Sequence, residues 1–320
     1  MAGSDESSNL KQTGGEGMKT GVEMPANVQT RRNKSIKSTL SWYVFLLPTF
    51  LGVACFIVYP VFESFRLSFY NSNGTIETWV GLTNYQRVLS QGAFWNAVYN
   101  TFYIAFFQLL LAIPIGFILA SMINRINRFK SVFKVMFFLP NVTSIVAAAM
   151  IFMFVLQPEV GLINHVLDTL GLPTSPWLSD PGTSKWGVIL LTIWHWIGFV
   201  IIICLANLQA ISPELYEASE IDGATGFQQW LFITIPNMAG TFAFLIIMGW
   251  ISGLQRFQEI FVLGGAGGSP GRSLQTMVAL IYERGFGGFE FGIASAITVL
   301  LFLIILLFTV LNIKLTRLKL

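Results

Sequence analysis

Residues 186–209 read WGVILLTIWHWIGFVIIICLANLQ, and this stretch contains no Asp, Glu, Lys or Arg. An α-helix needs about 20 mostly apolar residues to cross the roughly 30 Å of hydrocarbon in a membrane. A membrane-spanning β-strand is about half as long and alternates apolar with polar residues, which this stretch does not do. The stretch therefore predicts one transmembrane helix.

Charge-free stretches of similar or greater length recur along the chain. They lie between Lys37 and Glu63, Arg87 and Arg125, Lys134 and Glu159, Asp222 and Arg256, and Glu290 and Lys314. Charged residues make up only 11% of the chain and apolar residues 54%, which leaves too little charge to cover a soluble domain of this length. We therefore expect an all-α integral membrane protein with six transmembrane helices, near residues 40–64, 97–123, 133–156, 186–209, 238–260 and 291–313.

The distribution of positive charge predicts that both termini lie in the cytoplasm. With that topology, thirteen of the 19 Lys and Arg residues fall on the cytoplasmic side, as the positive-inside rule requires. The other six are Arg66, Arg87, Lys185, Arg256, Arg272 and Arg284.

The regions outside the spans differ in composition. Residues 1–36 are rich in Gly, Ser, Asn, Lys and Glu and lack aromatic residues, which predicts a disordered cytoplasmic tail. Residues 37–320 then form the transmembrane domain. Cys55 and Cys204 both fall within predicted spans, where they act as small apolar residues and imply no disulfide framework.

The cytoplasmic loop of residues 210–237 is unlike the others, because it contains four acidic residues and no Lys or Arg. Ser212-Pro213-Glu214 is typical of a helix start, with a hydroxyl N-cap, a proline at the first position and an acid in the first turn. Gly223 can end that helix after about three turns. The residues leave two interpretations open: a docking element on the inner face, or a solvated connector.

The same loop carries a family signature. Residues 217–224 read EASEIDGA and are followed by Ile235-Pro236, a pattern that closely resembles the EAA loop of permease subunits of ATP-binding cassette (ABC) importers. The usual second Ala is Ser219 here, a residue of similar size. The resemblance covers roughly residues 40–318. The segments that resemble the maltose-type sugar permeases are Asn100-Thr101, Phe138-Leu139-Pro140, Gly161-Leu162-Ile163-Asn164 and Phe291-Gly292-Ile293-Ala294-Ser295-Ala296.

The resemblance implies the fold of a type I ABC importer permease and a place in a larger machine. This chain would form half of the translocation path for a sugar or oligosaccharide that an extracytoplasmic binding protein delivers. A second, homologous permease would form the other half. Two copies of a cytoplasmic ATPase would bind ATP and Mg, so this chain would need no cofactor of its own. The implied location is the inner membrane of a bacterial cell, in contact with lipid and with no nucleic acid partner.

The resemblance also implies a role for the loop. In that family the EAA loop forms a coupling helix that sits in a cleft of the ATPase. Glu217 is the expected charged contact with the ATPase, whereas Asp222 can equally well act in local capping of the chain after the helix. The positions of this chain that match are Glu217, Ala218, Ser219, Asp222, Gly223 and Ala224.

Two predicted spans offer side chains that suit a sugar, which needs hydrogen bonds for its hydroxyls and an aromatic face for its ring. The spacing of three and four residues places each set on one helix face. In maltose-type permeases, which this sequence resembles here, the substrate contacts fall on the same two spans. The alternative is helix–helix packing by small residues, and Arg256 could also pair with Glu259. The candidates are Thr192, His195, Trp196 and Phe199 in the fourth span and Gly249, Ser252, Gly253 and Arg256 in the fifth.

Other kinds of site find no support in the residues. The glycine-rich segment 264–273 has Arg272 where a phosphate-binding loop requires Lys, so we expect a flexible outer loop there. His165 and His195 lie far apart without an accompanying Cys or carboxylate cluster, so we expect no metal site and no catalytic residue. An ion-coupled secondary transporter is the alternative function, but such proteins usually place several ionisable residues within their spans.

Overall fold

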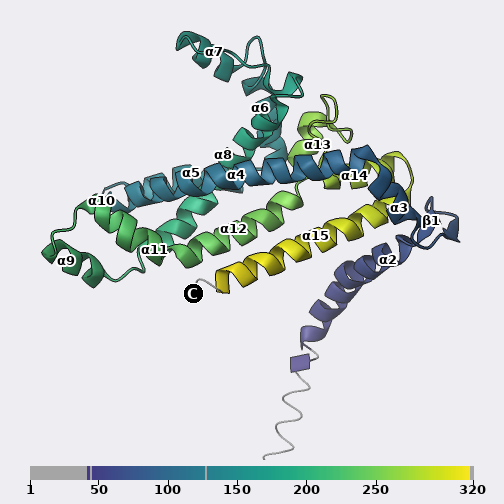
Figure 1. Cartoon of the computed structure of the whole chain (residues 1–320), viewed down its shortest axis with the longest axis horizontal. Coiled ribbons are helices and arrows are strands. Elements are labelled where there is room, and N and C mark those ends of the chain that lie inside the picture. The colour runs from purple at the N-terminus through teal and green to yellow at the C-terminus, as the bar shows by residue number, and fades with distance from the viewer. Residues whose placement is uncertain (1–41, 44, 127, 318–320) are drawn as a thin grey trace, which may run out of the picture. The chain divides into compact units, whose positions relative to one another are not determined.

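The computed structural model describes residues 42–43, 45–126 and 128–317, and these are predominantly helical (Figure 1). The predicted tail of residues 1–36 lies outside the described residues, so its disorder stays a prediction. The chain divides after Tyr59 into two units. The described part of the first unit is helical and includes a π-helical stretch, Ala54–Val58.

Four helices are each long and apolar enough to cross a membrane: Phe45–Leu67, Gly92–Arg125 (α4), Ser184–Leu208 (α8) and Phe291–Lys314, which is most of α15 (Phe291–Arg317). Two bent pairs of helices raise the number to six if each pair is counted as one span. The shorter elements are α2 (Tyr59–Leu67), β1 (Tyr70–Ser72), β2 (Glu77–Trp79), α3 (Thr83–Ser90), α7 (Leu162–Thr169), α9 (Pro213–Ile221), α10 (Gly226–Gln229), α11 (Ile235–Asn237) and α14 (Met277–Tyr282).

The core of the second unit lies where α4, α8 and α12 (Ala239–Leu254) pack together. Phe117 of α4, Ile201 of α8 and Leu245 of α12 belong to one buried apolar cluster. A second cluster joins α3, α4, α14 and α15. These helices carry apolar side chains on all their faces. Lipid is as apolar as the protein interior, so such side chains can face either one. This explains why the long apolar helices are only partly buried inside the protein.

The predicted third span, residues 133–156, is not one continuous helix. The structure has α5 (Lys130–Val142) and α6 (Ile145–Val155), which meet at an angle of 95°. Thr143 and Ser144 adopt extended backbone conformations between them. The Thr143 hydroxyl donates to the Pro140 carbonyl at 2.6 Å, and Ser144 caps the start of α6. Side-chain hydroxyls thus form hydrogen bonds with backbone groups that the break leaves without helical partners. A hydropathy pattern does not detect such side-chain to backbone bonds, which compete with the helical ones.

The position of α5 depends on a close approach to α8. A Cβ atom on Gly198 would lie 2.1 Å from the backbone oxygen of Phe137, so a larger residue at this position would push the two helices apart. Gly198 therefore fixes how closely the bent third span can pack against the fourth.

The predicted fifth span, residues 238–260, is also interrupted. It begins after a bend of 59° between Gly226–Asn237 and α12, and α12 ends at Leu254. Residues 255–257 are not helical, and α13 (Gln258–Gly264) follows. The Thr276 hydroxyl donates to the carbonyl of Arg256 at 3.1 Å, which satisfies one backbone group of the break. Arg256 is therefore not on the same helix face as Gly249, Ser252 and Gly253, contrary to the prediction.

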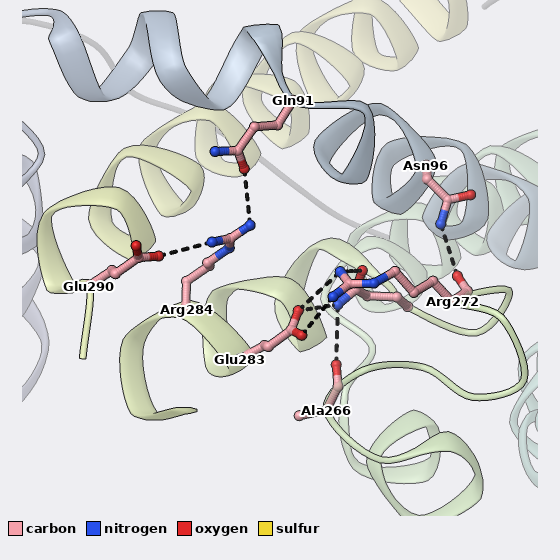
Figure 2. Close-up of polar contacts among 8 residues, drawn as sticks. Gln91, Asn96, Ala266, Arg272, Glu283, Arg284 and Glu290 are labelled. Atoms are coloured by element: carbon pink, nitrogen blue, oxygen red, sulfur yellow. Dashed lines mark hydrogen bonds and ion pairs between the residues drawn. The ribbon is translucent and has the colours of Figure 1, made fainter. Parts of the chain in front are cut away.

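The glycine-rich segment 264–273, which we expected to be a flexible outer loop, makes several hydrogen bonds with its surroundings. The side-chain amide of Asn96 donates to the carbonyl of Arg272 at 2.9 Å, and the Arg272 guanidinium pairs with Glu283 at 3.0 Å (Figure 2). Gln275 bridges the guanidinium and the carbonyl of Ala266. Polar side chains outside the segment therefore fix its conformation, and its glycine content alone did not predict this.

Candidate functional site

A cavity of about 440 Å³ lies where both helix breaks come together, between α4, α8 and the ends of α5, α6, α12 and α13. The break at residues 143–144 presents the Thr143 carbonyl, which is 3.3 Å from Nε2 of His195. The break at residues 255–257 contributes the side chains of Gln255, Arg256 and Phe257. The cavity is lined by Gln108, Asn141, Ile145, Thr192, His195, Trp196, Ser252, Gln255, Arg256, Phe257, Gln258 and Glu259.

Five of the eight residues predicted for a substrate path line this cavity, namely Thr192, His195, Trp196, Ser252 and Arg256. The other three do not. Phe199 packs beside Trp196, with ring centroids 5.9 Å apart. Gly249 lies against Leu109 of α4 and Trp196 of α8, and Gly253 lies against Ala105 of α4. Small size at both positions allows the helices to approach, so the packing interpretation describes these two positions.

Arg256 makes side-chain contacts with two other residues of the cavity. One terminal nitrogen, Nη1, donates to Oε1 of Glu259, and the other, Nη2, donates to Oε1 of Gln108. The two charged side chains are buried, with 11% of Arg256 and 7% of Glu259 exposed. The Nε atom of Arg256 is also buried and has no hydrogen-bond partner among the described residues. The pair is therefore a buried ion pair, in which loss of either partner would leave the other charge uncompensated.

Several polar residues of the cavity were not predicted from the sequence. Gln108 lies in the middle of α4 and is almost completely buried, and Asn141 follows the proline of α5. Gln255 precedes Arg256 in the second break, and Gln258 is the first residue of α13. An amide near the middle of a long apolar helix must face protein or a polar cavity rather than lipid, and this signal could have identified Gln108.

The acidic loop forms a short helix, α9, whose end is close to the prediction. Asp222 is the C-cap residue, and Gly223 follows with a left-handed φ of 79°. The amide of Ala224 donates to the carbonyl of Ser219 at 2.9 Å, which closes the turn. Ser212 does occupy the N-cap position, but its side chain makes no capping hydrogen bond, so that detail of the prediction was wrong.

One face of α9 is bound to the chain that follows it. The Tyr216 hydroxyl lies 3.0 Å from Oγ1 of Thr234, and the side-chain amide of Gln229 donates to Oγ of Ser219 at 3.0 Å. The other face is exposed, and Ile221 on it is 87% exposed. Glu217 makes no hydrogen bond or ion pair with any described residue, and it lies on the exposed side with Ala218, Asp222 and Gly223, whereas Ser219 and Ala224 are half-buried.

The segment after α9 connects this helix to the core. Trp230 follows α10 and lies in a π-helical stretch, Trp230–Thr234. Its indole N–H donates to the hydroxyl of Ser121 on α4 at 3.2 Å, and its ring stacks on Phe117 at 5.4 Å. A displacement of α9 would therefore act on α4 and on the bend at the start of α12, and α12 leads directly to Ser252 in the cavity.

Comparison with known proteins identifies the family. The sequence profile of the binding-protein-dependent transport system inner membrane component matches residues 112–317. The chain belongs to this family of permeases. The arabinooligosaccharide transport system permease of Bacillus subtilis is 33% identical to this permease over 276 residues, which are 86% of this chain and 88% of the relative. The trehalose/maltose transport system permease of Thermococcus litoralis is 30% identical over 279 residues, which are 87% of this chain and 94% of the relative.

A solved structure supports the same assignment. A chain of a bacterial alginate ABC transporter, in complex with an alginate pentasaccharide-bound periplasmic protein, matches this permease with a TM-score of 0.77. The two are 27% identical, and the match covers 89% of this chain and 96% of the other. The fold is therefore that of a type I ABC importer permease, as the sequence predicted, and the chain is a multi-pass membrane protein that acts as a transport subunit.

Proposed function

We propose that this permease forms half of the translocation path of an ATP-driven importer for a sugar or oligosaccharide, in the inner membrane of a bacterial cell. The observation that carries the proposal is the composition of the cavity at the two helix breaks. Trp196 offers an aromatic face, and Asn141, His195, Ser252 and Gln255 offer hydrogen-bonding groups around it. Few convergent polar groups beside an aromatic surface are typical of sites that bind small polar ligands.

The names of the relatives support the choice of substrate. They are described as permeases for arabinooligosaccharides and for trehalose and maltose, and the solved relative belongs to an importer of alginate. An extracytoplasmic binding protein would deliver the solute, and a second, homologous permease would complete the path. No observation favours an ion-coupled secondary transporter.

The exposed face of α9 is the proposed contact with a cytoplasmic ATPase, two copies of which would bind ATP and Mg. The residues that we assign to this contact are Glu217, Ala218, Asp222 and Gly223, with Ser219 and Ala224 holding α9 in place. Closure of the ATPase pair would move α9, and the contacts of Gln229, Thr234 and Trp230 would carry that movement to α4 and α12. The permease itself would hold no cofactor.

A screen of the cognate binding protein tests the proposed substrate class. The permease should be purified together with the products of neighbouring genes, and the captured binding protein should be freed of bound solute by unfolding and refolding. We expect a di- or oligosaccharide to raise the melting temperature of the binding protein, because a ligand that binds only the folded state stabilises it. Stabilisation by amino acids or metal ions, with no effect of any sugar, would contradict the proposal.

A further inference from the structure

The charged side chains of the cavity cancel each other. Arg256 and Glu259 are the basic and acidic residues among the Asp, Glu, Lys and Arg side chains that line it, and they form an ion pair with each other. His195 also lines the cavity, with its Nε2 near the Thr143 carbonyl. The remaining polar lining consists of amides and hydroxyls, which carry no net charge. The Arg256–Glu259 pair therefore adds no net charge to this polar cavity.

Both terminal nitrogens of the Arg256 guanidinium are already engaged by protein side chains. An arginine recognises a carboxylate best through two parallel N–H donors. Here Nη1 is used by Glu259 and Nη2 is used by Gln108. Nε is buried, so a solute carboxylate could reach only the remaining N–H groups of the terminal nitrogens, where it would lie beside Glu259 and be repelled.

We propose that Glu259 is a specificity-determining residue, which neutralises Arg256 and so makes the path select uncharged sugars over sugars that carry carboxylates. This inference rests on the proposed function, because it assumes that the solute passes through the cavity at the two helix breaks. Charge inside a cavity with low-dielectric walls concentrates ions of the opposite sign, and removal of the Glu259 charge would turn a neutral cavity into one that attracts anions.

Thiol labelling of the complete importer measures this property directly. The exposed Cys55 is replaced by Ser, the buried Cys204 is kept, and Ser252→Cys places a thiol in the cavity. The probes are the anionic sulfonatoethyl and the cationic trimethylammonioethyl methanethiosulfonates. The labelling rate of each probe is divided by the rate at which that probe reacts with free mercaptoethanol. The ratio of the normalised anionic rate to the normalised cationic rate then reports the sign of the charge near residue 252.

With Glu259 present, we expect the normalised rates for the anionic and cationic probes to be similar. Glu259→Gln should shift the ratio about tenfold towards the anionic probe. The double variant Glu259→Gln with Arg256→Gln is the matched control and should restore the original ratio, because it removes both charges. Two results would overturn the inference. One is a strong preference for the anionic probe when Glu259 is present, a result that can be obtained even if the variants fail to assemble. The other is an unchanged ratio of labelling rates in Glu259→Gln.

A second readout separates this inference from the proposed function. Ser252→Cys is labelled to completion with the small neutral reagent methyl methanethiosulfonate, and ATP-driven uptake is then compared with that of the unlabelled importer. We expect labelling to block uptake. Uptake that survives complete labelling would overturn the proposed path, and the specificity role of Glu259 with it, whatever the ratio of the charged probes.

Discussion

Glu217→Lys should abolish ATP-driven uptake while the permease is still inserted and folded. Glu217 lies on the exposed face of α9 and has no partner among the described residues, so the substitution removes no contact within the chain. Reversal of a charge at a protein contact costs several kcal/mol, and each 1.4 kcal/mol lowers affinity about tenfold. Co-purification of the ATPase and solute-stimulated ATP hydrolysis should therefore fall at least about tenfold.

Gly223→Asp should have the same consequence through charge. Gly223 has a φ of 79°, which Asp tolerates better than most residues, and a Cβ added there meets no other atom, so the substitution places a second carboxylate beside Asp222 in the proposed contact with the ATPase. Asp168→Lys is the matched control, because it reverses the charge of an exposed carboxylate on α7, away from α9 (Figure 1). It should leave association with the ATPase intact. Unchanged transport in both Glu217→Lys and Gly223→Asp would contradict the docking role of α9.

Arg256→Ala and Glu259→Ala should each lower the yield of assembled importer by a similar amount. Removal of one partner of a buried ion pair leaves the other charge without compensation, which costs about 3–5 kcal/mol. The double variant should recover much of the loss, because it leaves neither charge behind. Fluorescence-detected size exclusion of the four proteins, followed by thermal melts, measures this coupling.

The outcome distinguishes pairing from a direct role with the solute. Gln255→Ala is the control, because Gln255 lines the same cavity without belonging to the ion pair. Its yield should be normal. If Arg256→Ala alone assembled normally and yet lost uptake, Arg256 would serve the solute and not the pair.

The sequence predicted the spans better than it predicted their interruptions. The runs around α4, α8 and α15 form single helices, in which the hydroxyls of Thr101, Thr192 and Thr298 bond to carbonyls of the same helix. Thr143 and Ser144 lie inside a charge-free run of the same kind, but here Ser144 caps the start of a new helix and the chain turns by 95°. Hydropathy averages over such residues, so the break could not be seen in it.

The candidate site was predicted only in part, for a related reason. Helical spacing grouped Thr192, His195 and Trp196 correctly because α8 is continuous through them. It failed for Arg256, which lies beyond the end of α12. The contact of Arg256 with Gln108 joins residues from different helices, and spacing within one helix carries no information about such pairs.

Uptake into proteoliposomes tests most directly whether the permease is half of an ATP-driven importer. The complete complex is reconstituted with ATP inside the vesicles and the solute-loaded binding protein outside, and labelled solute is counted after filtration. We expect uptake that requires both ATP and the binding protein and that is unaffected when proton and sodium gradients are collapsed. Uptake driven by an ion gradient without nucleotide would contradict this function and would establish a secondary transporter instead.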